Sequence, residues 1–196
     1  MFIFAVRSGV RGAGLTAEFS NQSDDPNLPP GDYFGALLGA GQSIGRGDGA
    51  FVNNSLCLNV DETRLHEDRT WSLERSYSAC GPIAALSVRG DLGTAHLVAS
   101  FAATCEQYRG PTWDCGQMDI DLTMRGVGPT TTYHEVTVSG AGGPGRSITR
   151  ASGSSRGAVF ASGHVTLGDR SFTSDGAVVT QAWLFDLQRG TVTIGA

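Results

Sequence analysis

The sequence contains no lysine: all fourteen basic side chains among its 196 residues are arginine. Schiff-base chemistry, a pyridoxal linkage and an orthodox phosphate-loop lysine are therefore excluded. Glutamate is also scarce, with six residues, and the net charge is −5. A negative chain is a poor partner for nucleic acid, because phosphate binding needs a concentrated positive field. From these absences we expect no cofactor and no nucleic-acid partner.

Long apolar runs are missing as well. No stretch approaches the roughly 18 consecutive apolar residues that cross a bilayer as a helix. The opening MFIFAVRSG has about six apolar residues before Arg7, which is too short for the core of a signal peptide. We therefore expect no membrane insertion. Three origins stay open: a cytosolic protein, a mature secreted product, or part of a particle.

The composition favours strands over helices. Leu, Ile, Val and Phe make up 44 of the 196 residues, so the core must be completed by Ala, Met, Trp and Tyr. Glycine is abundant, with 28 residues, and strong helix formers are few. Such a chain is expected to fold as many short strands joined by turns.

Alternation of apolar and polar residues supports the same class. In MDIDLTM (118–124) every second residue is apolar, which is typical of a strand with one buried face. AALSV and TAHLVASF on either side of an RGDLG turn predict a hairpin. The pattern predicts a single antiparallel β-sandwich or β-barrel over 51–196. Residues 1–50, rich in Gly and Pro, are predicted to form an irregular arm, and 61–77 has the charge spacing of a short helix.

The four cysteines are Cys57, Cys80, Cys105 and Cys115, and no two of them form a C-x-x-C motif. Three complete pairings are possible, and we favour Cys57–Cys80 with Cys105–Cys115. Free buried thiols and a four-cysteine metal site are the alternatives. Two disulfides would place the folded chain in an oxidising space, outside the cell or on a particle surface.

The segment CEQYRGPTWDC, residues 105–115, is the best candidate for a recognition loop. Tyr, Trp and Arg supply much of the binding energy at interfaces, and their side chains stack on sugars or bases. Nearby carboxylates can accept hydrogen bonds from hydroxyl groups. The residues predicted to bind are Glu106, Tyr108, Arg109, Trp113 and Asp114. The alternative is that Tyr108 and Trp113 cover the open end of the sheet, with Arg109 paired to a carboxylate.

Three short motifs match functional patterns without their required context. GAGGPGRS (140–147) has arginine in the lysine position of a phosphate loop and no helix signal after it. GSSRG (153–157) matches a nucleophile elbow, but no acid lies between it and the last histidine, His164. RGD occurs twice, at 46–48 and 89–91, as chance allows in a chain rich in Arg and Gly. None of the three is predicted to be a site.

Histidines and paired acids offer weaker candidates. An inward-facing pair of His96 and His134 could form a small polar site, although a satisfied or exposed histidine is the more common case. Asp119 and Asp121 share one strand face and could act as paired carboxylates, but opposite an apolar face they are expected to face solvent. No catalytic or metal-binding residue is therefore predicted.

The C-terminal part of the chain shows one resemblance. CGQMDIDLTMRGVGPTTTYHEVTVSG, ASGHVTLGDRSFTSDGA and the terminal GTVTIG resemble the C-terminal pattern of small uncharacterised secreted proteins of high-GC bacteria, over about 80 residues. The resemblance implies a β-rich secreted protein and assigns no function and no residue roles. The missing signal peptide departs from that pattern unless the chain is a mature form.

These observations favour a non-enzymatic structural or binding β-module, extracellular or at a particle surface. It would self-associate as a homo-oligomer, or bind a protein partner or a glycan, through its end loops. An irregular arm without its own core would become ordered on a neighbouring subunit. The alternative is a small β-barrel enzyme, such as a cyclase or isomerase, with an internal pocket containing groups such as His96 and His134. A glycan-acting hydrolase with two carboxylates is a third option.

Overall fold

The computed structural model describes residues 2–22, 26–45, 51–139, 146–172 and 180–194. The regular elements of these residues are all β-strands, which confirms the predicted all-β antiparallel class. The strands are β1 (Phe2–Ser20), β2 (Gly31–Gly45), β3 (Phe51–Leu65), β4 (Trp71–Pro82), β5 (Ala85–Val88), β6 (Thr94–Gln107), β7 (Thr112–Ser139), β8 (Arg146–Leu167), β9 (Arg170–Phe172) and β10 (Thr180–Ile194). The described residues contain no helix long and apolar enough to cross a bilayer.

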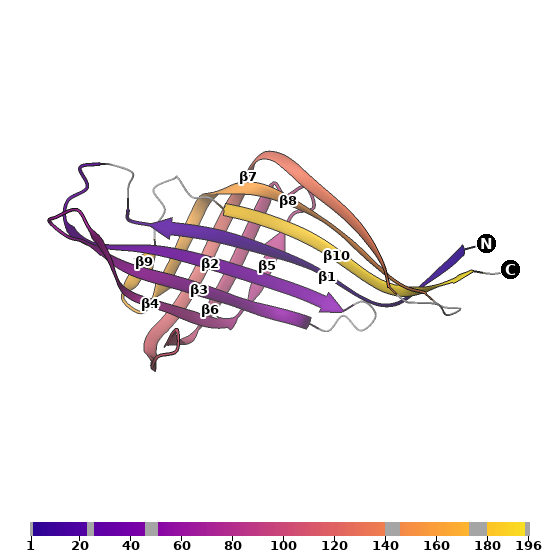
Figure 1. Cartoon of the computed structure of the whole chain (residues 1–196), viewed down its shortest axis with the longest axis horizontal. Coiled ribbons are helices and arrows are strands. Elements are labelled where there is room, and N and C mark those ends of the chain that lie inside the picture. Colours follow the sequence, from indigo (N-terminus) through magenta and orange to yellow (C-terminus); the bar gives the residue numbers. More distant parts are fainter. Residues whose placement is uncertain (1, 23–25, 46–50, 140–145, 173–179, 195–196) are drawn as a thin grey trace.

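The strands are hydrogen-bonded in a ring. The order is β10-β1-β2-β3-β4-β6-β7-β8, and β8 pairs in turn with β10; β5 and β9 are short additions to β6 and β8. The ring is not a regular barrel, because β4 and β6 share a short ladder from Tyr77↔Gln107 to Ala79↔Cys105. Figure 1 shows β1 to β4 as one layer that runs steeply across a second layer of β6, β7 and β8.

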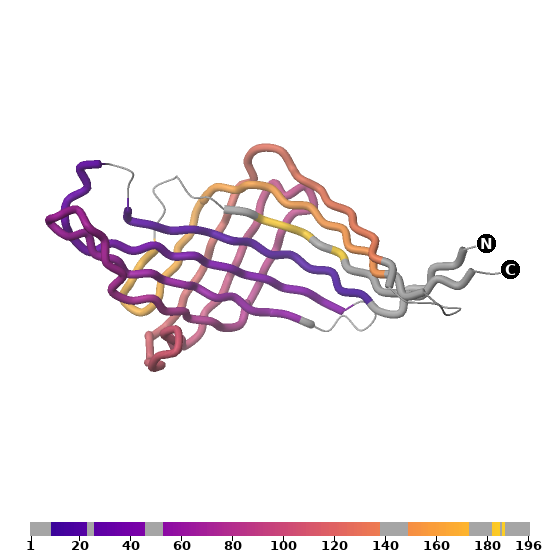
Figure 2. Tube along the Cα trace, viewed as in Figure 1, coloured from indigo at the N-terminus to yellow at the C-terminus, as the bar shows by residue number. Residues whose placement is uncertain are grey.

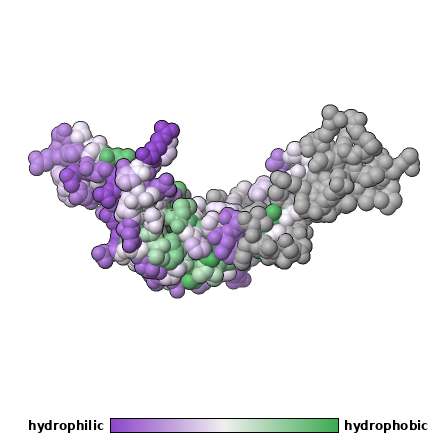
Figure 3. Space-filling model, turned by 90° about the horizontal axis from the view of Figure 1, so that it is seen from below, coloured by the Kyte–Doolittle hydropathy of each residue, from purple (hydrophilic) through white to green (hydrophobic). Residues whose placement is uncertain are grey.

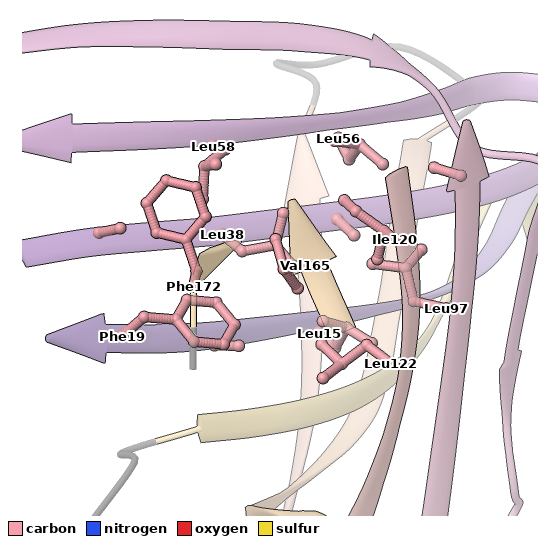
Figure 4. Packing of buried hydrophobic residues seen from close by; sticks show 14 of the residues in the cluster. Leu15, Phe19, Leu38, Leu56, Leu58, Leu97, Ile120, Leu122, Val165 and Phe172 are labelled. Carbon is pink, nitrogen blue, oxygen red and sulfur yellow. The ribbon is translucent and has the colours of Figure 1, made fainter. Parts of the chain in front are cut away.

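Buried side chains fill the space between the two layers. The predicted alternation in β7 is correct: Met118, Ile120, Leu122 and Met124 are at most 1% exposed. Figure 4 shows Ile120, Leu122, Leu97 and Val165 of the second layer meeting leucines of β1, β2 and β3. The leucines labelled there on the first layer are Leu15, Leu38, Leu56 and Leu58. Burial of this apolar area, at about 25 cal/mol per Å², is the main force that holds the layers together.

The prediction of an irregular arm over residues 1–50 is wrong for the described part of that segment. It forms β1 and β2, two long neighbours in the sheet. The inward positions of β2 hold Ala36, Leu38 and Ala40, while glycines take outward positions. Glycine weakens a strand locally, but pairing on both edges and an inward apolar row override that preference.

The short helix expected over 61–77 is also absent. Residues 61–65 end β3, a turn follows, and Trp71 begins β4. The turn is closed by the His66 N–H, which donates to Thr70 O at 2.9 Å, and by the Arg69 N–H, which donates to His66 O at 3.0 Å. The charge spacing was a local signal, and cross-strand pairing with β2 and β4 outweighed it.

Both predicted disulfides are present. Cys57 and Cys80 lie directly opposite each other on β3 and β4, with a Cα–Cα distance of 4.1 Å. Cys105 and Cys115 join the adjoining ends of β6 and β7, with a Cα–Cα distance of 5.7 Å. All four cysteines are therefore used, which excludes the free-thiol and four-cysteine metal alternatives. Two disulfides indicate an oxidising environment for the folded chain.

Candidate functional site

The loop between β6 and β7 is a tight turn stapled at its base. The Gly110 N–H donates to Gln107 O at 2.9 Å, and the Gln107 N–H donates to Pro111 O at 3.2 Å. The Cys105–Cys115 bond closes the loop behind these hydrogen bonds. Cys105 is fully buried, so the staple anchors the loop to the core. The chain at the tip is thereby held in one conformation.

Tyr108 and Arg109 form the tip of this loop. The Tyr108 side chain is 79% exposed, and the Arg109 guanidinium lies over its ring, 5.1 Å from the centroid. Arg109 has a positive φ of 54°, in the left-handed region that non-glycine residues seldom adopt. Such a conformation costs on the order of 1–3 kcal/mol and is found disproportionately at binding sites. The turn therefore displays an aromatic face stacked on a cation.

A surface groove runs beside Tyr108 over the outer face of β3, β4 and β6. Its volume is about 680 Å³. The register places Asn59, Ser78 and Glu106 in one row across the three strands. The remaining lining residues are Ser76, Tyr77, Tyr108 and Arg109. The groove thus combines one exposed aromatic ring with amide, hydroxyl and carboxylate groups.

Trp113 points into the structure rather than into this groove. It is half-buried, and its ring meets Tyr77 edge-on with centroids 5.5 Å apart. The Arg75 guanidinium lies 5.6 Å from the centre of the Trp113 ring. Of the two interpretations of the loop, Trp113 fits the one in which the aromatic side chains cover the end of the sheet, and Tyr108 fits the one in which the loop exposes a side chain for recognition.

An ionic cluster surrounds Tyr77 and Arg75, the two residues whose side chains contact Trp113. Glu62 of β3 accepts from Arg170 of β9 at 2.6 Å and lies 3.9 Å from Arg75. The Tyr77 hydroxyl accepts from Arg170 at 3.2 Å and donates to Glu62 at 3.4 Å. Burial is the main cause that raises the pKa of Tyr77, since the tyrosinate would lose its hydration. These contacts hold the Tyr77 and Arg75 side chains beside the Trp113 ring.

The two predicted carboxylates have different surroundings. Asp114 accepts from the Gly116 N–H at 2.8 Å, where the chain bulges between β6 and β7. Gly116 has a positive φ of 79°, so Asp114 holds a turn that glycine makes possible. Glu106 is exposed and lines the groove. Of the five residues predicted to bind, the structure brings Glu106, Tyr108 and Arg109 together and gives Trp113 and Asp114 supporting contacts.

A second hollow, of about 350 Å³, lies at the end of the sheet near the β3–β4 turn. Four of its charged groups form two ion pairs: Arg64 donates to Asp32 at 2.7 Å, and Arg170 to Glu62 at 2.6 Å; its fifth, Glu74, accepts from the Ser72 hydroxyl at 2.6 Å. The hydrogen bond from Arg64 is the main cause that lowers the pKa of Asp32. A ligand here would have to displace these bonds, whereas the groove offers hydroxyl and amide groups beside an exposed ring. The groove is therefore the better candidate.

The histidine and aspartate candidates lie on outer faces. His96 contacts Asp121 with Nε2 2.8 Å from Oδ1, and His164 contacts Asp119 with Nε2 3.1 Å from Oδ2. These pairs bridge β6, β7 and β8, and their aspartates are at least partly exposed, as predicted. His134 is exposed farther along β7, so the inward-facing His96–His134 pair is not formed. Neither histidine lies in the interior, which removes them from an internal enzyme pocket.

The remaining motifs keep no catalytic context. GSSRG lies wholly within β8 and not at a strand–turn–helix elbow. Arg89-Gly90-Asp91 forms the predicted turn between β5 and β6, with Arg89 and Asp91 paired at 3.3 Å. The first RGD and most of GAGGPGRS lie outside the described residues. Among residues that the structure describes, no three His, Cys, Asp or Glu side chains are grouped to hold a metal ion.

The groove residues on β3 and β4 could not be found from the sequence pattern. Asn59, Ser76 and Ser78 are ordinary outward residues of alternating strands, and nothing distinguishes them locally. Their placement beside Glu106 depends on the register of β3, β4 and β6, which joins segments far apart in the chain. The pairing of cysteines 57 and 80 was the one available signal, because it fixes the β3–β4 register.

Comparison with known proteins found no match among family models, curated proteins or solved structures. The assignment of the groove as the candidate site therefore depends on its geometry and its lining residues.

Proposed function

We propose that this chain is a non-enzymatic binding module of an extracellular or particle-surface protein, and that it binds carbohydrate in the groove beside the stapled loop. The observation that carries the proposal is the exposed Tyr108 ring at the rim of a groove lined by polar side chains. Sugars present apolar C–H faces and many hydroxyl groups, so they are recognised by an aromatic surface together with hydrogen-bonding groups.

The groove supplies both kinds of contact from a rigid frame. The Asn59 amide both donates and accepts, Ser76 and Ser78 carry hydroxyls, and Glu106 accepts. Ser76 already donates to Asp61 at 2.6 Å, which leaves its oxygen free to accept from a ligand. The stapled turn pre-orders Tyr108, so little conformational entropy is lost on binding.

Binding is tested by titrating neutral and acidic oligosaccharides into the protein by calorimetry. We expect Tyr108→Ala to weaken binding by at least about tenfold, equivalent to about 1.4 kcal/mol. Glu106→Gln should weaken it less, since the amide oxygen still accepts. Tyr133→Ala is the matched control, because Tyr133 is also exposed (52%) but lies on β7 beyond the sandwich.

Two results would contradict the proposal. One is that no oligosaccharide of the panel binds to the wild-type protein. The other is that the Tyr108 and Tyr133 variants lose affinity equally, which would mean that the ring in the groove is not the binding surface.

A further inference from the structure

The two disulfides differ in how far their cysteines are buried. Cys105 is fully buried, and Cys115 packs against the hydrophobic core. Cys80 is exposed and Cys57 is only half-buried, and neither of them is part of the described core. Access decides how readily a thiol attacks a disulfide, and exposed disulfides are the labile or regulatory ones. The Cys57–Cys80 bond is therefore the one that a thiol in solution can reach.

The alternation of β3 and β4 places this bond on the outer face of the sheet. Leu58 of β3 and Ala79 of β4 are fully buried, and each is the sequence neighbour of one of the two cysteines. Successive residues of a strand point to opposite faces, so Cys57 and Cys80, which lie opposite each other in the ladder, both face outward. The bond thus crosses the surface of the sheet from one strand to the next.

The surface on either side of the bond is open. On the β2 side, Cys57 lies opposite Gly39, and a Cβ added at Gly39 would meet nothing within 4 Å. On the other side, the ladder of β4 with β6 ends at Ala79↔Cys105, so no described strand pairs with Cys80 on the side away from β3. Figure 2 shows the trace of β4 crossing that of β6 at a steep angle, so the two strands separate beyond this ladder. Cys80 therefore lies at an open edge of the sheet.

The nearest outward side chains do not repel an anion. The residues two positions from each cysteine on the same face are uncharged: Ser55, Asn59, Ser78 and Pro82. Figure 3, which turns the lower edge of Figure 1 with β4 and β6 toward the viewer, shows hydrophobic residues at the surface midway along the molecule. The nucleophile in thiol–disulfide exchange is a thiolate, which nearby carboxylates would repel. None of these four neighbours opposes its approach.

We propose that the Cys57–Cys80 disulfide is a modification site that exchanges with a small thiol, such as a cysteine-containing peptide. The thiolate attacks Sγ of Cys80, the more exposed of the two residues. A new S–S bond forms between the thiol and Cys80, and the Cys57–Cys80 bond breaks with Cys57 leaving as a thiolate. A second thiolate attacks the sulfur of the bound thiol, which releases Cys80 as a thiolate and the two small thiols as their disulfide. Two electrons pass from the small thiols to the protein disulfide.

The adduct on Cys80 lies at the border of the groove. Ser78, which lines the groove, shares the outer face of β4 with Cys80, and the two residues are about 7 Å apart along the strand. In a consequence that rests on the proposed carbohydrate-binding function, an adduct of peptide size beside Ser78 obstructs the groove and weakens saccharide binding several-fold. The Cys105–Cys115 staple, which holds the loop that carries Tyr108, stays closed.

The experiment treats the folded full chain with reduced glutathione at neutral pH, blocks free thiols with N-ethylmaleimide and identifies the state of each cysteine by peptide mass spectrometry. We expect Cys57–Cys80 to react at least about tenfold faster than Cys105–Cys115, with glutathione on Cys80 and the blocking group on Cys57. The matched control Cys57→Ala, Cys80→Ala should form no adduct while it is folded. Equal rates for the two bonds, faster reaction of Cys105–Cys115, glutathione chiefly on Cys57, or reaction only in urea that unfolds the chain would overturn the proposal.

A second measurement separates this site from the carbohydrate function. In Cys57→Ala the Cys80 thiol is free and takes up glutathione from oxidised glutathione. Calorimetric titration then compares the modified and unmodified forms of this variant with a saccharide that the wild-type protein binds. We expect weaker binding by the modified form, and equal affinities would overturn the obstruction of the groove. If no saccharide binds the wild-type protein, the proposed function fails, and mass spectrometry still decides whether the exchange occurs.

Discussion

Removal of the Cys105–Cys115 disulfide tests how the fold positions the candidate binding loop. Replacing both cysteines by alanine opens a loop with a sequence separation of 10, for which the chain-entropy estimate is about 2.7 kcal/mol of lost stability. Loss of the sulfur at the fully buried Cys105 adds a cavity cost on the order of 1 kcal/mol. The matched variant is Cys57→Ala, Cys80→Ala, with a separation of 23 and an estimate of about 3.4 kcal/mol.

The two variants should lose similar stability but differ in binding. Without the staple, the turn that carries Tyr108 gains freedom, and the entropy of re-ordering it should weaken oligosaccharide binding several-fold. The Cys57–Cys80 bond lies outside that turn, next to Asn59 and Ser78 on β3 and β4, where the β3–β4 ladder also holds the register; its loss should therefore weaken binding less than loss of the staple does. Urea unfolding measures stability, and calorimetric titration measures affinity under conditions in which both variants are folded. An equal affinity in the two variants, or a larger loss in the Cys57–Cys80 variant, would refute the role given to the staple.

Three further predictions concern the fold. Burial raises the pKa of Tyr77 above that of an unfolded tyrosine, so the contribution of its protonated form to the free energy of unfolding is complete below about pH 10 and falls as the pH rises through the folded pKa. Tyr77→Phe should therefore make the decline of the urea midpoint between about pH 9 and about pH 11 shallower. An unchanged decline contradicts this. Gly163 has a φ of 114°, and a Cβ there would overlap the carbonyl oxygen of Asp121, so Gly163→Ala should lower the free energy of unfolding by more than about 1 kcal/mol. Gly39→Ala, with open space at its Cβ, should be neutral or slightly stabilising. Equal effects of the two substitutions in urea unfolding would show that the backbone at Gly163 is not constrained. Leu38→Ala, at a position with no exposed surface, should cost about 2–5 kcal/mol in the same assay, and a cost below about 1 kcal/mol would contradict its place between the layers.

The fold class followed from local pattern where that pattern was strong. The alternation of 118–124 placed Ile120 inside and Asp121 outside, and both positions are correct. In β2, Ala36, Leu38 and Ala40 face inward, but the apolar Leu37 between them and the many glycines of the segment hide the alternation, so the local pattern predicts an irregular segment. Glycine propensity is a property of the isolated segment, and pairing with two neighbouring strands reverses its consequence.

The candidate site was predictable in part. The loop and both disulfides came from the cysteine spacing and the flanking strand patterns. The row of Asn59 and Ser78 beside Glu106 depends on the register of three strands, which composition and periodicity do not encode. The different surroundings of Trp113 and Tyr108 also required tertiary structure, since Trp113 is held by Tyr77 and Arg75 from another strand.

The most direct test of the central claim is to map a bound oligosaccharide onto the protein by NMR. Backbone and side-chain amide shifts are followed while a saccharide that binds in the calorimetric panel is added. We expect the largest changes at the Asn59 side-chain amide and at the backbone of Ser78, Glu106 and Tyr108, with little change at His96, near the other end of β6. Shifts that cluster elsewhere and leave the groove unchanged would contradict the assignment of the groove as the binding site.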